Sequence, residues 1–325
     1  SNKMIKEIIK ELMQDIKKKE SIDNDKAAFG KGYNTFSINQ NNFEEIEISN
    51  ETNIAFIDGG NGEILKSNNF SLQFIRICAL GTKKLINEFY CLAYTIKKDN
   101  EIFYTSKIFQ VKGEKLLEDN EISISSTDNS FKQGIFRANI SIIGDIVRKV
   151  AERKIAMFVE EKNIVFDGTL ETIHDKETSI VNSLNKNLYA LAKTSTIFTE
   201  NGNNLLAMLN NMKKGLWKYK IAESALTKHK ANIFVVKLNT KSNYVFRFEA
   251  RDSNTNVLDF LCRNSTDPVF LGYPYNLIKC DKFARVSNKE IEYMKTKIVS
   301  SLGQDFEVID KYQNSVNAHS ILDSI

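Results

Sequence analysis

Two apolar segments of the sequence end in the same pair of residues, an aspartate followed by a glycine. Asp58 follows the segment NIAFI, and Asp167 follows NIVF. An Asp-Gly pair after a hydrophobic run is a strong hairpin signal, so each aspartate could simply open a turn. Alternatively, two strands ending alike would bring two carboxylates to one edge of a sheet, where a cation must offset their repulsion. Oxygen ligands of this kind suit Mg²⁺ and Mn²⁺.

Two further carboxylates could complete such a site. Glu152 lies four residues after Arg148 in a predicted helix, which indicates either a surface ion pair worth about 0.2–0.5 kcal/mol or a carboxylate that reaches the same edge. Asp281 lies in a helix that starts with an aromatic-proline-aromatic segment at Tyr273. Taken alone, Asp281 is typical of a solvated helix residue.

The elements that must position these residues follow from hydrophobic periodicity. An antiparallel meander is predicted from strands at 53–58, 70–81, 88–98 and 102–111. The predicted elements after it are a helix at 130–161, a strand at 163–168, a helix near 175–186, a strand at 189–193, a helix near 203–213, strands at 233–238 and 244–250, helices at 274–286 and 288–301, and a short final helix. A meander followed by α/β alternation predicts a mixed sheet with helices on its faces.

The N-terminal region differs from the rest of the chain. Residues 4–16 carry apolar side chains at helical spacing, which predicts an amphipathic helix that packs on its own domain or on a second subunit, with a membrane or another partner as the alternative. Residues 20–50 are polar and are expected to connect without much structure. We therefore predict an N-terminal helix and polar connection at 1–50 and a single domain at 51–325.

Composition limits the class of protein. Hydrophobic residues make up 42% and charged residues 26%, as is typical of soluble globular proteins, and the net charge of +4 permits an anionic partner without requiring one. The four cysteines lack metal-ligand spacing and are expected to be reduced and packed. Because no run of 18 apolar residues and no signal peptide are present, we expect a cytoplasmic protein without membrane association.

Taken in order, these motifs resemble the NurA nucleases. The resemblance rests on Asp-Gly-Gly after the first strand, Arg148 with Glu152, DGTL at 167–170, LAKTS at 191–195, VVKL at 235–238, YVFRFE at 244–249 and GYPYNLIKCDKFARVS at 272–287. It implies an α/β fold of the RNase H-like class: a mixed β-sheet flanked by helices, here with an N-terminal helical arm. In that fold the first strand carries a metal-binding aspartate ahead of a hairpin.

The resemblance also implies a function. Proteins of this family are metal-dependent DNA nucleases with 5′→3′ exonuclease and single-strand endonuclease activity, and they act in DNA end processing and repair. The implied cofactor is Mn²⁺ or Mg²⁺, with two ions expected, and the implied partners are DNA, a HerA-type hexameric ATPase and a second copy of the chain. The implied catalytic and metal-binding residues are Asp58, Glu152, Asp167 and Asp281, and the implied DNA-binding residues are Arg148, Lys193 and Tyr273.

Three positions depart from the family pattern. Gly60 replaces a common serine and Thr169 a common proline, both mild changes. Asp281 stands where many members carry histidine, which adds an oxygen ligand and removes a proton donor. Either the second metal is held differently, or His319 or another group takes that role. The change leaves open a DNA-binding or scaffolding relative with weakened catalysis, and an unrelated α/β protein whose aspartates close turns is the third reading.

Overall fold

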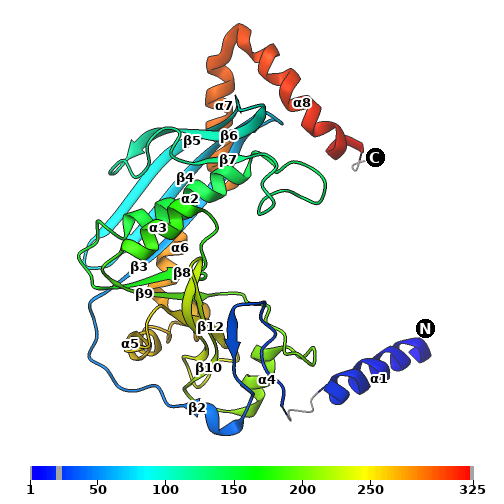
Figure 1. Ribbon diagram of the computed structural model, residues 1–325, viewed down its shortest axis with the longest axis vertical. Helices are drawn as coiled ribbons and strands as arrows, with labels where there is room; N and C mark the ends of the chain where they lie inside the picture. Colours follow the sequence, from blue (N-terminus) through cyan, green and yellow to red (C-terminus); the bar gives the residue numbers. More distant parts are fainter. Residues whose placement is uncertain (1, 20–23, 323–325) are drawn as a thin grey trace. The chain divides into compact units, whose positions relative to one another are not determined.

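The computed structural model describes residues 2–19 and 24–322, which fold into two compact units (Figure 1). The first unit contains the described residues up to 56, together with 161–172 and 185–278. The second unit contains 57–160, 173–184 and the described residues from 279 onward. Each unit therefore draws on segments that are distant in sequence. The predicted domain division at residue 50 stays a prediction.

The first unit contains a mixed sheet. Its strands lie in the order β1 (Tyr33–Thr35), β10 (Trp217–Leu226), β11 (His229–Lys237), β12 (Phe246–Ala250), β9 (Asn187–Ala192) and β8 (Asn163–Asp167), and β2 (Phe43–Glu44) also pairs with β10. β8 and β9 run parallel, whereas the other pairs are antiparallel. The parallel pair agrees with the predicted α/β alternation, since parallel neighbours need a crossover connection.

Two parts of this sheet differ from the prediction. β10 was not predicted, because lysines at 218 and 220 interrupt its apolar residues. Its side chains nevertheless alternate between buried and half-buried from 217 to 221, as a strand requires, up to the irregularity before Ala222. The segment at 20–50 was expected to lack structure, yet β1 and β2 both pair with β10. A polar sequence can still form strands when a neighbouring strand supplies the hydrogen-bond partners.

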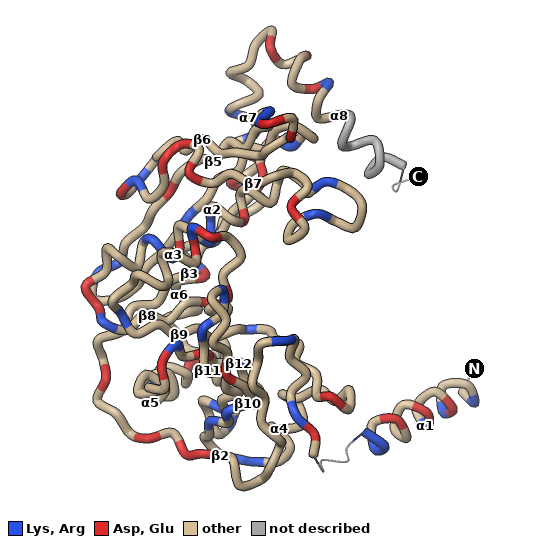
Figure 2. Tube along the Cα trace, viewed as in Figure 1, with Lys and Arg blue, Asp and Glu red and all other residues tan. Residues whose placement is uncertain are grey.

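The helices of the first unit are α1 (Asn2–Lys19), α4 (Leu205–Met212), α5 (Val257–Arg263) and the first residues of α6 (Tyr275–Ala284). The predicted N-terminal helix is confirmed, but none of its residues is buried, and Ile8 is 58% exposed. Figure 2 shows lysines and acidic residues mixed along α1. Packing of α1 on a second subunit stays a prediction. Within the described ranges, no helix combines the length and apolar character needed to cross a membrane.

The second unit is built on the predicted antiparallel meander. Its strands are β3 (Ile54–Lys66), β4 (Phe70–Leu80), β5 (Lys84–Lys98), β6 (Glu101–Lys112) and β7 (Ser123–Ser125), in that order, and β3 starts with three residues of the first unit. α2 (Ile142–Ile155) packs on β4, β5 and β6, and α3 (Asp175–Ser183) packs on α2 (Figure 1). α7 (Asn288–Leu302) and α8 (Phe306–Leu322) contribute to an apolar cluster with Ile64 and Phe74.

Two predictions for the second unit were wrong in their boundaries. The helix predicted at 130–161 begins only at Ile142, after a turn in which the amide of Ile142 bonds the carbonyl of Asn139. The hairpin predicted directly after Asp58 is also absent, because β3 continues without interruption to Lys66. All four cysteines are buried free thiols, as predicted.

Candidate functional site

Residues 58–60 of β3 are a point of close contact in the second unit. A Cβ atom on Gly59 would lie 2.6 Å from Oε1 of Glu152 on α2, and one on Gly60 would lie 2.4 Å from the backbone oxygen of Ala284 on α6. Side chains at neighbouring strand positions point to opposite faces, so α2 and α6 approach β3 from its two sides. The glycines therefore lie inside a strand because no side chain fits there, and not because they form a turn.

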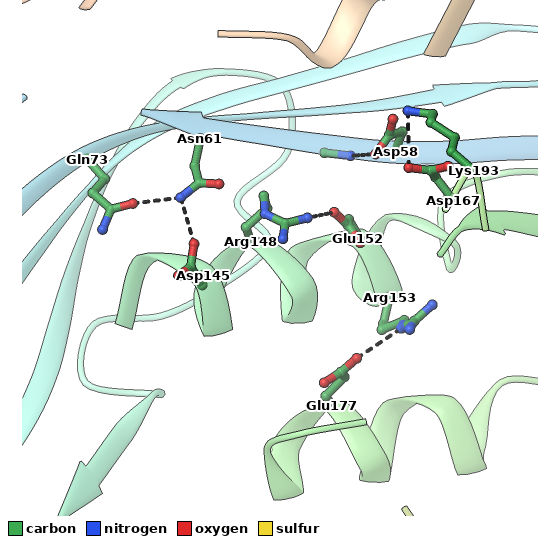
Figure 3. Close-up of polar contacts among 11 residues, drawn as sticks. Asp58, Asn61, Gln73, Asp145, Arg148, Glu152, Arg153, Asp167, Glu177 and Lys193 are labelled. Atoms are coloured by element: carbon green, nitrogen blue, oxygen red, sulfur yellow. Dashed lines mark hydrogen bonds and ion pairs between the residues drawn. The ribbon is translucent and has the colours of Figure 1, made fainter. Parts of the chain in front are cut away.

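Asp58 lies directly before these glycines. Asp58 as a whole residue is 7% exposed, and its Oδ1 accepts a hydrogen bond from the amide of Gly59 at 2.8 Å (Figure 3). Because Asp58 and Gly60 are two residues apart on one strand, they share the face on which α6 packs. The predicted ligand is thus a nearly buried carboxylate in a tightly packed strand.

Glu152 and Arg148 form an ion pair within α2, between Nη1 of Arg148 and Oε1 of Glu152 (Figure 3). The side chain of Glu152 is 8% exposed and that of Arg148 is 21% exposed, so this is not the surface pair that the spacing alone favoured. Burial raises the pKa of Glu152, although the positive charges of Arg148 and Arg153 act in the opposite direction. A metal site at β3 requires this second arrangement, in which the carboxylate of Glu152 is buried and contacts the strand.

Two residues that sequence reasoning missed lie beside this pair. The side-chain amide of Asn61 donates to Oδ1 of Asp145 at 3.0 Å and to Oε1 of Gln73 at 2.7 Å (Figure 3). Asp145 is three residues before Arg148 on α2, and its negative charge contributes to the raised pKa of that arginine. The i,i+3 spacing of Asp145 and Arg148 in the sequence is the pattern from which their proximity could have been predicted.

Asp281 lies on α6, one turn before Ala284, and α6 therefore brings it toward β3. Its Oδ2 forms an ion pair with the guanidinium of Arg285, and its side chain is 28% exposed. The partner, Arg285, was not predicted, although its i,i+4 spacing from Asp281 is readable in the sequence.

In the first unit, Asp167 ends β8 and has two polar partners. The hydroxyl of Tyr273 donates to its Oδ1 at 2.8 Å, and Nζ of Lys193 lies 3.4 Å from its Oδ2 (Figure 3 shows the lysine). The next residue, Gly168, has a φ of +103°, so this Asp-Gly pair does leave its strand through a turn. Asp167, a predicted metal ligand, is therefore in contact with Lys193 and Tyr273, which were predicted to bind DNA.

Tyr273 is only 1% exposed, which limits what it can do. Its ring centroid lies 5.1 Å from that of Phe246 and 5.4 Å from that of Phe270. A ring enclosed in this way presents its hydroxyl, rather than its face, to the site. The structure thus assigns Tyr273 an orienting contact with Asp167, and its predicted role in DNA binding stays a prediction.

The donor chemistry of these residues fits a hard divalent ion, since all four predicted ligands are carboxylates. The space at Gly59 is filled by one of them, Glu152, together with the side chain of Ile77. Among the side chains that the structure describes, those of residues 2–19 and 24–314, however, no three of Asp, Glu, His or Cys are gathered closely enough to hold a metal. Three of the carboxylates instead pair with basic side chains, those of Arg148, Lys193 and Arg285. The side chain of His319, the alternative donor, lies outside the described part.

Comparison with known proteins gives a likeness in fold. No family model matches the sequence, and neither does any curated protein. The NurA nuclease from Sulfolobus solfataricus is similar in structure with a TM-score of 0.51 and 14% identity, over 94% of this chain and 95% of that chain.

Two weaker likenesses involve endonuclease V. The Ciona intestinalis protein, in complex with DNA containing an inosine followed by a ribo-adenosine, matches at a TM-score of 0.35 and 12% identity, over 74% of this chain and 86% of that one. Human ENDOV matches at a TM-score of 0.34 and 8% identity, over 78% of this chain and 94% of that one. Likeness of that degree says nothing about function. The match along nearly the whole chain confirms the predicted fold class, and the protein has a NurA-like fold.

Proposed function

We propose that the protein is a metal-dependent nuclease that hydrolyses phosphodiester bonds in DNA. The observation that carries the proposal is the buried carboxylate of Glu152, which lies against Gly59, the residue after Asp58 in β3, in a chain of NurA-like fold. This carboxylate is kept in a packed interior with Arg148 as its charged partner, and a hard divalent ion is the other kind of cation that could balance it. Fold alone does not establish an activity, so the proposal depends on these residues.

The proposed ligands are Asp58, Glu152, Asp167 and Asp281, with Mn²⁺ or Mg²⁺ as the ion and two ions per site. Such ions polarise a phosphoryl oxygen and lower the pKa of water.

The remaining site residues are proposed to manage charge and orientation. Lys193 and Arg148 would neutralise the negative charge of the DNA phosphate, while the hydroxyl of Tyr273 holds the carboxylate of Asp167 in one rotamer. Recognition would be mainly of the phosphate backbone, and DNA binding should therefore weaken steeply with added salt.

The biological setting is proposed from the family resemblance. It comprises 5′→3′ exonuclease and single-strand endonuclease activity in DNA end processing, a homodimer, and a HerA-type hexameric ATPase as partner in the cytoplasm. The mixed charge and exposed apolar side chains of α1 are compatible with a protein partner.

The decisive experiment is a cleavage assay on linear single- and double-stranded DNA with Mn²⁺, Mg²⁺ or EDTA. The wild type should cleave with Mn²⁺ and lose activity in EDTA, and Asp58→Asn should abolish cleavage. Asp99→Asn is the matched control, because Asp99 is exposed in a hairpin turn at a φ of 50°, a conformation that asparagine tolerates. Unchanged cleavage by Asp58→Asn would exclude the proposed metal site.

A second candidate is a DNA-binding or scaffolding protein with weakened catalysis. It is favoured by Asp281, which stands where many family members have histidine. The carboxylate of Asp281 is ion-paired with Arg285. DNA binding by the wild type without cleavage in either metal would support this second candidate over the nuclease.

A further inference from the structure

Arg148 lies between two acidic residues of its own helix. Glu152 follows it by four residues and Asp145 precedes it by three, so both carboxylates lie on the same side of α2 as the guanidinium. Arg148 is ion-paired with Glu152, and the side chains of Asp145, Arg148 and Glu152 follow one another along the helix (Figure 3).

The two acidic neighbours have different surroundings. Glu152 is 6% exposed and its carboxylate lies against Gly59, whereas Asp145 is only half-buried. One oxygen of Asp145 is already held by the side-chain amide of Asn61, which is itself bonded to Gln73. Asp145 therefore has a fixed carboxylate within reach of the arginine, and it is not a proposed metal ligand.

We propose that, in the protein without DNA, Arg148 exchanges partners along α2, pairing with Glu152 when no metal is bound and with Asp145 once a divalent cation engages Glu152. This inference rests on the proposed function, because it takes Glu152 as a ligand. It goes further in assigning Asp145 a role, that of a positioning residue that receives the displaced guanidinium.

The reason is the charge balance of a packed site. A buried carboxylate needs a cationic partner at all times, and Arg148 supplies one to Glu152. A divalent cation and a guanidinium repel each other and compete for the same oxygens, so binding of the cation requires the arginine to leave. Arg148 is itself four-fifths buried at its side chain and needs a counter-charge. The carboxylates whose charge acts on it are those of Glu152, Asp145 and Asp58, and of these Asp145 is the one that is not a proposed ligand.

The test is calorimetric titration of the metal-free protein with Mn²⁺ in the absence of DNA. Arg148→Met removes the competing cation and should bind Mn²⁺ about fivefold or more tightly than the wild type. Asp145→Asn removes the second acceptor and should weaken binding by about fivefold or more. The variant with both substitutions should bind Mn²⁺ as tightly as Arg148→Met does, because it has no guanidinium that residue 145 would need to accept.

Two controls separate partner exchange from general charge effects. Lys149→Met removes a positive charge from the next residue of α2 and should tighten Mn²⁺ binding by less than Arg148→Met. Arg148→Gln repeats the Arg148→Met experiment with a polar side chain. For every variant, a rise of the unfolding midpoint on addition of Mn²⁺ checks that the protein is folded and binds the ion.

The outcomes are distinguishable. If the wild type does not bind Mn²⁺, the proposed function and this inference both fail. If the wild type binds Mn²⁺ and Asp58→Asn abolishes binding, the proposed metal site is supported. Partner exchange is then decided by the Mn²⁺ affinities of the Arg148 and Asp145 variants. It is overturned if Arg148→Met binds no more tightly than Lys149→Met, or if Asp145→Asn weakens binding equally when Arg148 is absent.

Discussion

The phenolic hydroxyl of Tyr273 donates a hydrogen bond to Oδ1 of Asp167 over 2.8 Å, from a side chain that is 1% exposed. The two residues are separated by 106 positions in the sequence. A donor fixed in an aromatic cluster restricts the carboxylate to one orientation and leaves its second oxygen toward Lys193. Such contacts to a ligand are a common means of tuning a metal site.

Replacing Tyr273 by phenylalanine should weaken both the fold and the site. Loss of a buried hydrogen bond to a charged group should lower the free energy of unfolding by about 1–2 kcal/mol in urea titrations. If Asp167 is a ligand, Mn²⁺ affinity should fall about 10- to 100-fold. Tyr293→Phe is the control, since Tyr293 is 67% exposed. Equal stability of the two variants would contradict the assigned contact.

Alanine at Gly60 should be among the most damaging single-methyl changes in the protein. Its Cβ would lie 2.4 Å from a backbone oxygen of α6, which cannot move without shifting the helix. We expect a loss of about 1–3 kcal/mol in unfolding free energy. Gly59→Ala meets only side-chain ends, those of Glu152 and Ile77, and should therefore cost less stability but disturb Mn²⁺ binding more.

Gly30→Ala is the control for both glycine variants, because no atom lies within 4 Å of the added methyl group. Its unfolding free energy should match that of the wild type within about 0.5 kcal/mol. A Gly60→Ala variant as stable as Gly30→Ala would rule out the close approach of α6 to β3.

The ion pair between Arg153 on α2 and Glu177 on α3 should contribute strongly to the cohesion of the second unit. Its side chains are 4% and 1% exposed, and Glu177 also accepts a hydrogen bond from the amide of Ile173 at 2.9 Å. Glu177→Ala leaves a buried guanidinium without its carboxylate and should destabilise the protein by about 3–5 kcal/mol.

The exposed pair of Lys83 and Glu160 provides the comparison, since its side chains are 71% and 73% exposed. Glu160→Ala should change the unfolding free energy by no more than about 1 kcal/mol. Chemical denaturation of both variants under the same salt measures the difference, and similar values would show that the Arg153–Glu177 pair is not buried in solution.

Glu290 should make stability depend on acid pH. Its hydrogen bond from Arg76, at 2.8 Å, lowers the pKa of Glu290 to about 2. A folded-state pKa below the unfolded value contributes stability that is present above about pH 4.5 and is lost as the pH falls toward 2. Glu290→Gln should therefore lose less stability than the wild type between pH 4.5 and 2, as measured by thermal unfolding. Parallel curves for the two proteins would contradict this assignment.

Much of the fold could be predicted because its signals are local. The strands at 70–80 and 101–112 are apolar segments bounded by polar turns, and the helices at 275–284 and 288–302 carry apolar residues at helical spacing. The prediction failed for β10, where lysines interrupt the apolar alternation, and for the start of α2, where apolar residues occur in turns. Periodicity reports which residues can be buried, but not which partner will bury them.

The candidate site divides in the same way. The sequence by itself determined which groups are available: two aspartates after apolar strands, an arginine and a glutamate one helical turn apart, and a tyrosine before a helix. Only the tertiary structure decided that Glu152 is buried, that Tyr273 presents its hydroxyl to Asp167, and that Gly59 and Gly60 continue a strand. The physical reason is that an i,i+4 pair or an Asp-Gly pair has the same local geometry at a surface as in a packed site. The difference comes from side chains about a hundred residues or more away, whose positions are set by packing.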